Sequence, residues 1–583
     1  MRKPLLTLFF TAFSVLAFTQ GTSINLNTDS YIFMNRLDIK YAQVIPIEFT
    51  ADKPYSRADV ARVAESLLLS NIRFNKVEKS QLQYLVDENS EWLDSLHSRT
   101  ARPLFKVLYT EPASFFSVSS KKKGLWDLRI NPLIGVTIGG ESGGGGRFLF
   151  DRSLGLEVRG DIKQVLSFYF NATGNDERAP YYVSQINTLG PQTYATGSTY
   201  IFRNVPGESY YKIYSSSIFK FKDGVDYWDA RGYVKAHILK YIDLSFGRDK
   251  FFIGDGMRSL ILSDYSAPYL FLKFDVRFWR FNYENIFAQL NYGYVQSGPD
   301  MLLPTKYMAV HHLTLNTSPW LTLGLFETVI FERSQFEISY LNPVIFYKAV
   351  ESSLGNPDKV SIGGDFKINA AHHFQIYGQA LLNEFNARHF FAHDGWWANK
   401  WAIQAGAKYV DIAPGLDAQL EFNIVRPYTY TADGTDNFTN YNQPLADPLG
   451  ANFYEIIMNL RYQPMPKWSF NAKFFVAKVG TDTLINGVMS NYGSNILLPD
   501  GGGSTPFIQN QLGNHLLQGA VGSIAYFEFL TSYQPWHNIY IDASILYRSD
   551  NTVKSPDNPI TSQSSFMFNI GFRINLARRT YEF

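Results

Sequence analysis

Histidine pairs are the first residues whose spacing could do chemistry, because helical zinc sites use two histidines four residues apart. His389 and His393 have that spacing. The residues between them, Phe390-Phe391-Ala392, lack the glutamate that acts as general base in such sites, and we expect this stretch to be a loop. The chain has no cysteine, which excludes disulfides, thiolate metal sites and thiol nucleophiles. We therefore expect neither a metal nor another cofactor.

Other chemistry-bearing patterns also favour structural roles. His311-His312 and His372-His373 are adjacent pairs near strand ends, and neighbours on a strand point to opposite faces, so neither pair chelates one ion. Gly139-Gly140 with Gly143 to Gly146 lacks the Lys and Ser/Thr of a phosphate loop and predicts a hairpin tip. Asp433 to Asp436 is too sparse for an EF-hand calcium loop. No pattern of serine, histidine and acidic residues identifies a triad, so we predict that the chain is not an enzyme.

The composition predicts a large folded protein without a nucleic-acid partner. The 583 residues are 45% hydrophobic and only 18% charged, which is too apolar for a disordered chain. The formal net charge is +1, and such a chain lacks the basic surface that nucleic acids select. The chain contains 37 Tyr, 47 Phe and 10 Trp, so aromatic area is used heavily.

The first residues indicate export. Arg2 and Lys3 precede an apolar run from Leu5 to Phe18, and Ala17 and Thr19 are small residues at the spacing that a signal peptidase reads. We predict that residues 1–19 are a signal peptide, cleaved near Thr19-Gln20. No later stretch approaches the roughly 20 apolar residues of a spanning helix. If the mature chain lies in a membrane, it must do so as a closed barrel.

Residues 20–123 are predicted to form a helical, periplasmic region. Ser56 can cap a helix, with Asp59 three residues on and apolar residues recurring on one face as far as Leu68. A second amphipathic stretch runs from Val77 to Leu96. Apolar stripes show burial but not the partner, so a separate periplasmic domain and a plug under a barrel mouth both remain open.

From Leu125 the hydrophobic period changes to two, which predicts a β-barrel over residues 124–583. Short turns alternate with long polar loops such as Gly174 to Ser209, which is typical of outer-membrane barrels. Eight turns join sixteen strands, and one further strand at each end gives about eighteen antiparallel strands. The expected turns are Gly160-Asp161, Ile238 to Tyr241, Val276-Arg277, Ser318-Pro319, Ala370 to His372, Ala413 to Leu416, Gln463 to Pro466 and Gln534 to His537.

The last predicted strand alternates between apolar and mostly polar residues from Ser565 to Leu576, and the chain then stops at Phe583. A terminal strand that ends in an aromatic residue resembles the recognition signal of outer-membrane assembly machinery. We therefore expect that machinery and outer-membrane lipid as partners, and localisation in the outer membrane of a Gram-negative cell.

Several segments resemble the Wzi capsule-assembly family. The segment from Gly247 to Gly256, GRDKFFIGDG, is followed by Leu260 to Asp264, LILSD. Tyr31 to Lys40, YIFMNRLDIK, resembles the mature start of the Bacteroidetes branch, which includes the gliding-motility protein RemB. His311 to Leu313 and Tyr340 to Pro343 resemble its middle strands. The resemblance covers most of the mature chain and implies an eighteen-stranded barrel with a helical bundle at its periplasmic mouth, and a surface polysaccharide as partner.

The resulting hypothesis is an outer-membrane protein that binds or anchors surface polysaccharide. A gliding-motility surface protein and a channel for small solutes are the alternatives. The family-motif segment, residues 247–264, is either structural or ligand-binding and contributes the first candidate residues. Trp396 and Trp397 belong either to the outer aromatic girdle or to a platform on which sugar rings stack. The candidate residues of the family-motif segment are Gly247, Arg248, Asp249, Gly254, Gly256, Ser263 and Asp264.

Overall fold

The structure is a computed structural model that describes most of the chain. The described residues are 21–44, 50–93, 114–120, 125–143, 146–163, 165–188, 192–193, 199–200, 205–293, 302–333, 337–342, 346–355, 358–485, 488–500, 510–552 and 563–583. The predicted signal peptide lies outside them.

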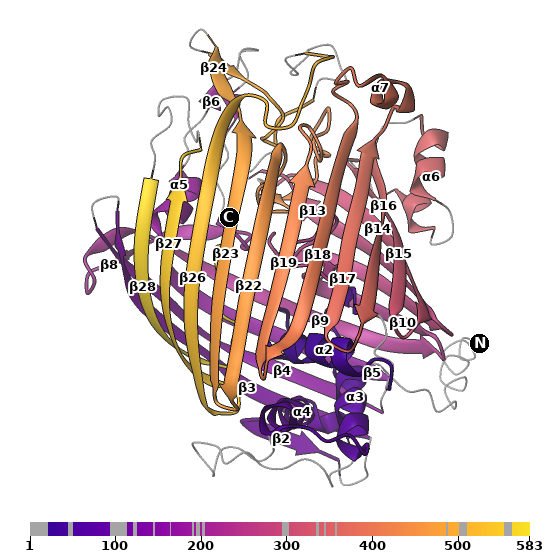
Figure 1. Cartoon of the computed structure of the whole chain (residues 1–583), viewed down its shortest axis with the longest axis vertical. Helices are drawn as coiled ribbons and strands as arrows, with labels where there is room; N and C mark the ends of the chain where they lie inside the picture. The colour runs from indigo at the N-terminus through magenta and orange to yellow at the C-terminus, as the bar shows by residue number, and fades with distance from the viewer. Residues whose placement is uncertain are drawn as a thin grey trace, which may run out of the picture.

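Eighteen antiparallel strands form a closed barrel, which confirms the predicted fold class (Figure 1). Each strand pairs with the next along the barrel, and β28 closes the circle by pairing with β3 through partners such as Ile570 and Ile138. The strands are β3 (Trp126–Ser142), β4 (Arg147–Ile162), β5 (Leu166–Arg178), β9 (Phe221–Leu239), β10 (Ile242–Asp249), β12 (Tyr269–Phe278), β13 (Phe281–Asn291), β14 (Thr305–Ser318), β15 (Leu321–Phe331), β16 (Lys359–Ala370), β17 (Phe374–Glu384), β18 (Lys400–Ala413), β19 (Leu416–Val425), β22 (Phe453–Met465), β23 (Trp468–Thr481), β26 (Ala520–Trp536), β27 (Ile539–Asp550) and β28 (Gln563–Ile574).

Eight short turns lie at one end of the barrel, the turn end, and the long connections lie at the other, the loop end. Two turns fall later in the sequence than predicted. Gly160 pairs with Leu128 inside the β3–β4 ladder, and β4 continues to Ile162. Likewise, β12 continues past Val276-Arg277 to Phe278. In both cases the residue after the strand, Lys163 or Trp279, takes the positive φ of a tight turn, of 54° each.

The barrel strands alternate between an apolar outer face and a lumenal face. On β28, Phe566, Phe568, Ile570 and Phe572 are exposed on the outside, whereas Ser565 and Met567 are buried in the lumen. An apolar outer belt of this kind suits a barrel surrounded by lipid. Among the described residues, no helix is long and apolar enough to cross a membrane.

The chain does not end in its last strand, which corrects the prediction that the terminal strand reaches Phe583. Strand β28 ends at Ile574, and residues 575–583, the C-terminal tail, turn back into the lumen, where Phe583 is only 8% exposed (Figure 1). Two ion pairs hold the tail there. Arg578 of the tail pairs with Glu528 of the wall, and Lys473 of the wall pairs with Glu582 of the tail. Phe583 is therefore not the last residue of a strand, although that position was the reason to expect the outer-membrane assembly machinery as a partner.

Three N-terminal helices pack together at the turn end. They are α2 (Asp29–Tyr41), α3 (Arg57–Leu69) and α4 (Lys76–Glu88), followed by the 3-10 turn η1 (Ser90–Trp92). The Ser56 hydroxyl accepts from the Asp59 N–H, as predicted for the start of α3. The helices share their own apolar core. It consists of Ile24, Phe33, Met34, Leu37, Val60, Ala61, Ala64, Leu67, Leu82, Leu85, Val86 and Leu93.

Residues 21–93, called the plug below, include these helices. Ion pairs and hydrogen bonds, rather than apolar contacts alone, attach the plug to the barrel wall. The Tyr84 hydroxyl donates to Asn538 in the β26–β27 turn, at 2.7 Å, which locates the plug at the turn end. A two-residue strand, β1 (Asp52–Lys53), carries Asp52 into hydrogen bonds with Asn282 and His312 of the wall. Further ion pairs join Arg36 with Asp411 and Asp417, Lys40 with Asp411, Asp38 with Lys367, Asp59 with Arg277, Glu88 with Arg159 and His537, and Glu91 with Arg129 and Arg159.

Two differences from the predicted helical region are local. Helix α2 was not predicted, and β2 (Phe116–Ser119) is a strand that pairs with β3 within the region expected to be helical.

The loops carry the remaining elements. They are β6 (Gln192–Thr193), β7 (Thr199–Tyr200), β8 (Tyr211–Ser216), β11 (Phe252–Ile253), β20 (Thr439–Asn440), β21 (Gln443–Pro444), β24 (Thr483–Ile485), β25 (Val488–Ser490), α5 (Tyr181–Thr188), α6 (Tyr347–Ser353), α7 (Ala387–Ala392) and η2 (Ile338–Leu341).

Candidate functional site

The motif loop, residues 250–268 between β10 and β12, folds into the lumen instead of extending away from the loop end. Its short strand β11 pairs with β1 of the plug, with Ile253 opposite Asp52. Leu260, Ile261 and Leu262 are fully buried. The loop therefore joins the plug to the wall from inside the barrel.

At two positions of the motif glycine is required, by a positive φ at Gly254 and by the close approach of neighbouring atoms at Gly256. Gly254 has a φ of 128°, which only glycine adopts readily, and its carbonyl accepts from Lys53 of the plug at 2.8 Å. A Cβ on Gly256 would lie 2.7 Å from carboxylate and amide oxygens of Glu421 and Gln404. These contacts favour a packing role for both glycines.

The remaining motif residues are not brought together at one point. Alternation along β10 places Gly247 and Asp249 on the lumenal face and Arg248 on the outer face. Ser263 donates to the carbonyls of Leu445 and Ala446, which ties the motif loop to a neighbouring loop. Asp264 accepts from Asn27 at the start of the plug.

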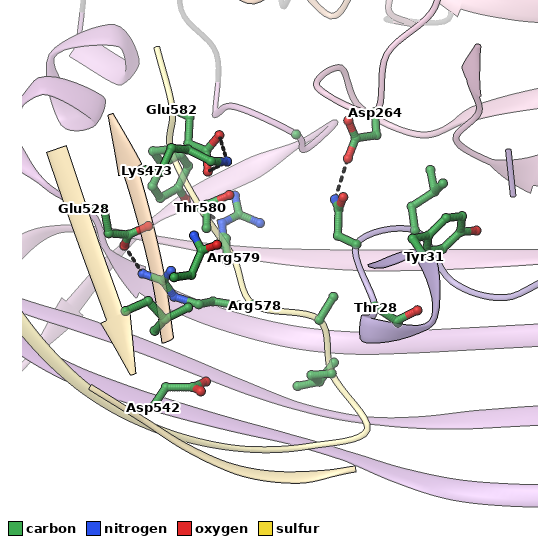
Figure 2. A pocket seen from close by; sticks show the side chains of 18 of the residues that line it. Thr28, Tyr31, Asp264, Lys473, Glu528, Asp542, Arg578, Arg579, Thr580 and Glu582 are labelled. Carbon is green, nitrogen blue, oxygen red and sulfur yellow. Dashed lines mark hydrogen bonds and ion pairs between the residues drawn. The ribbon is translucent and has the colours of Figure 1, made fainter. Parts of the chain in front are cut away.

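A cavity of about 780 Å³ occupies the lumen between the plug, the motif loop and the C-terminal tail (Figure 2). Thr28 and Tyr31 of the plug line one side, and Asp264 projects from the motif loop. Arg578 and Glu582 of the tail line the opposite side. Three segments that are far apart in sequence therefore meet around one space.

The arginines that line this cavity are paired with carboxylates, whereas lysines such as Lys250 bond to neutral oxygens. Arg578 binds Glu528 of β26, and Arg579 binds Glu208, at 2.7 Å. Burial and the nearby Arg231 guanidinium lower the pKa of Lys250 to about 8, and its ammonium donates to the Gly207 carbonyl at 2.9 Å. A lining of paired arginines and of lysine, amide and hydroxyl groups can bind a polar molecule. Among the described residues, no group of three or more His, Asp or Glu could hold a metal ion.

The two candidate tryptophans lie in the β17–β18 connection at the loop end, and both are half-buried. Trp396 stacks on His389 of α7, with ring centroids 4.6 Å apart. The Lys400 ammonium lies 4.8 Å from the centre of the Trp397 ring. Both tryptophans are thus held by neighbouring side chains, and Trp396 adjoins the exposed surface of α7 through His389.

That surface is an aromatic cap at the loop end. Phe390 and Phe391 of α7 are 40% and 75% exposed, and Leu512 of the β23–β26 connection is 50% exposed. Backbone hydrogen bonds hold the two connections together, including Trp397 N–H to the Gln511 carbonyl at 3.0 Å. The cap, defined as Phe390, Phe391, Trp396 and Leu512, was not predicted as a unit, because its members come from separate loops.

His389 and His393 do not form a helical pair. Helix α7 ends at Ala392, and His393 takes a left-handed conformation with φ of 51°. His389 instead lies 2.6 Å from an Asp394 carboxylate oxygen.

The polar loop from Thr429 to Gln443 is largely buried. Lys306 of β14 holds it by donating to the carbonyls of Thr435 and Asn437, at 3.0 and 2.7 Å. Thr429, Asn440 and Gln443 are fully buried. Its composition resembles that of an open surface loop, but its hydrogen-bonding groups are already used inside the protein.

A closed antiparallel barrel with an apolar outer face, short turns at one end and a filled lumen belongs to the class of outer-membrane β-barrels. No family model and no curated protein matches the sequence. Among solved structures, the chain is similar to Wzi of Escherichia coli, described as an outer membrane protein involved in group 1 capsule assembly and a carbohydrate-binding β-barrel. The TM-score is 0.54 at 13% identity, over 96% of this chain and 100% of that one. The fold expected from the Wzi resemblance is confirmed.

Pseudomonas aeruginosa OprD and OccK2, the latter in complex with glucuronate, are more distant. Their identities are 10% and 8%, each covers 77% of this chain, and 95% and 98% of their own chains are matched. Both TM-scores are 0.39, which is too low to support an inference about this chain.

Proposed function

We propose that this protein is exported, lies in the outer membrane with its turn end in the periplasm, and binds or anchors surface polysaccharide at its loop end. In this proposal residues 1–19 are the signal peptide, 20–123 the periplasmic region and 124–583 the barrel. The fold shared with Wzi, a carbohydrate-binding barrel, is the observation that carries the proposal.

The filled lumen favours binding over conduction. A solute passing through would have to displace the plug, the motif loop and the C-terminal tail, which all border the same cavity. Ion pairs such as Asp38 with Lys367 and Glu582 with Lys473 hold these segments to the wall. The alternative of a small-solute channel therefore requires a large rearrangement.

The aromatic cap supports polysaccharide binding because sugar rings stack on flat apolar faces that are bordered by hydrogen-bonding groups. Phe391 offers such a face, and the Trp396 ring is held in place by stacking on His389 of the same helix. Truncating one stacking contact costs on the order of 1 kcal/mol, by analogy with aromatic pairs. A long polymer makes several contacts at once, so single substitutions are expected to have mild effects.

The test compares surface polysaccharide retained by cells that express different variants in a deletion background. The cap variant is Phe390→Ser, Phe391→Ser, Trp396→Ala, and the matched control is Phe346→Ser, which removes another exposed aromatic residue (71% exposed) away from α7. We expect the cap variant to shed polysaccharide, as the deletion does, and the control to retain it. All variants must reach the outer membrane and migrate faster unheated than heated on SDS gels.

Retention by the deletion strain would overturn the proposal, whereas retention by the cap variant alone would move binding to another surface of the loop end. A gliding-motility surface protein is the second candidate, through the resemblance of Tyr31 to Lys40 to the Bacteroidetes branch. Loss of gliding in a deletion strain that keeps its surface polysaccharide would favour it.

A further inference from the structure

The outer face of β4, β5 and β9 changes from apolar to charged within one step along the strands. Leu154 and Trp228 are 51% and 70% exposed and flank Gly174 in one row across the three strands. The next row toward the loop end consists of Arg152, Asp176, Asp226 and, on the added strand β8, Lys212. A tryptophan on the turn-end side of a charged row marks the edge of the hydrocarbon layer.

Strand β8 and the start of β9 form a hairpin beside this edge (Figure 1). The Phe219 ring at its tip stacks on Phe148 and packs at a tilt against Phe150, both of β4, with centroids 5.0 and 4.9 Å away. Ile218 at the same tip is 83% exposed, and Ile213 of β8 is 67% exposed. The hairpin therefore offers an apolar surface directly beside charged groups.

The basic charge of this surface exceeds its acidic charge. Arg152 pairs with Asp176, and Arg147 and Arg178 share Asp223, at 2.8 Å each, so neither carboxylate is left to neutralise the lysines of the hairpin. Lys212, Lys220 and Lys222 are exposed, and among the described residues none of the three forms an ion pair. Only Asp226, which lies opposite Lys212 in register, offsets them.

We propose that this surface, the basic hairpin of Lys212, Lys220 and Lys222 with the apolar residues Ile218 and Trp228, binds a phosphate-bearing lipid of the surrounding leaflet. Lys212 lies one row beyond Trp228, and Lys222 and Lys220 follow farther toward the loop end, on the side where the phosphates of lipid head groups are located. The acyl chains then run along Trp228 and Leu154 toward the turn end. The proposal requires the barrel to lie in a membrane, but it is independent of polysaccharide binding.

The experiment uses the full chain, purified in an uncharged detergent and incubated with lipid A that carries two phosphates or with the same lipid after removal of its phosphates. Lipid that remains bound after gel filtration is quantified by mass spectrometry. The test variant is Lys212→Gln, Lys220→Gln, Lys222→Gln. The matched control replaces three exposed lysines at the turn end, Lys163→Gln, Lys240→Gln and Lys467→Gln.

We expect the wild type and the control to retain the phosphorylated lipid on the order of tenfold better than the dephosphorylated one, and the hairpin variant to lose most of that preference. Raising the salt concentration should weaken retention by the wild type in the same way, without any substitution. Equal retention of both lipids by the wild type would overturn the proposal. So would a hairpin variant that retains as much phosphorylated lipid as the control, or a control that loses as much as the hairpin variant.

Discussion

Lys473 of β23 donates to both carboxylate oxygens of Glu582, at 2.7 Å each, and thereby fixes the C-terminal tail inside the barrel. Arg258 of the motif loop donates to the backbone carbonyl of the same residue. The tail is thus shared between the wall and the motif loop. Burial would raise the pKa of the Glu582 carboxyl, but Lys473 and Arg258 outweigh it and hold that pKa below its ordinary value.

Removing residues 576–583 should therefore enlarge the lumen and loosen the motif loop. We expect the truncated protein to reach the membrane, to unfold at a lower temperature in a gel-shift assay, and to admit small hydrophilic dyes more readily than the wild type. A milder variant, Glu582→Gln, should lower the unfolding temperature less. Unchanged unfolding temperature and dye entry in the truncated protein would show that the tail does not close the lumen.

Deleting Asn25 to Ser98 should open the turn end, because the plug in this segment is attached by polar contacts such as Tyr84 with Asn538. Single-channel recordings in planar bilayers should show a stable large conductance for the deletion variant and little or none for the wild type. A correctly assembled deletion variant that stays closed would contradict the role of the helices as a plug.

Gly256→Ala should destabilise the motif loop. The added methyl group would lie 2.7 Å from the Arg258 carbonyl and from the Glu421 carboxylate, and overpacking of this kind costs about 1–3 kcal/mol. Gly174→Ala is the matched control, since its Cβ would have no neighbour closer than 3.9 Å. The gel-shift temperature should fall for Gly256→Ala and change little for the control. Equal behaviour of the two would exclude the steric explanation.

The loop after β23 should be more stable in mild acid. Burial raises the pKa of Asp482 to about 7, well above an ordinary aspartate, and the side chain is only 7% exposed. A raised pKa in the folded state favours the neutral carboxyl, so this contribution is fully present below about pH 4 and is lost as the pH rises through 7. We expect Asp482→Asn to stabilise the protein by about 1–3 kcal/mol at pH 8 relative to wild type, and hardly at all at pH 4. An equal effect at both pH values would contradict the assignment.

Local patterns predicted the barrel well because alternation and turn residues are encoded within each hairpin. They placed a turn too early at Gly160-Asp161, since Gly and Asp also occur inside a ladder where the lumen accepts them. The same limit applies to Phe583, because the contacts that draw the tail into the lumen, such as Lys473 with Glu582, join residues far apart in the sequence. The inward fold of the motif loop depends on contacts such as Gly254 with Lys53, about 200 residues apart, which no local pattern contains.

The candidate site was predicted only in part for the same reason. The motif glycines were singled out through the family resemblance and the pair Trp396-Trp397 from their residue type, but Phe391 and Leu512 belong to the same surface only in the folded loop end. The loop from Thr429 to Gln443 has the polar composition of an open surface loop, and only the structure shows that Lys306 draws it inward.

Binding of surface polysaccharide to the purified protein is the most direct measurement of the proposed function. Polysaccharide released from the surface of the host strain would flow over immobilised wild type, the cap variant Phe390→Ser, Phe391→Ser, Trp396→Ala, and the control Phe346→Ser. We expect saturable binding to the wild type and the control, and strongly reduced binding to the cap variant. Absence of binding to folded wild type, together with a large conductance of the same preparation in bilayers, would overturn polysaccharide binding and favour a channel.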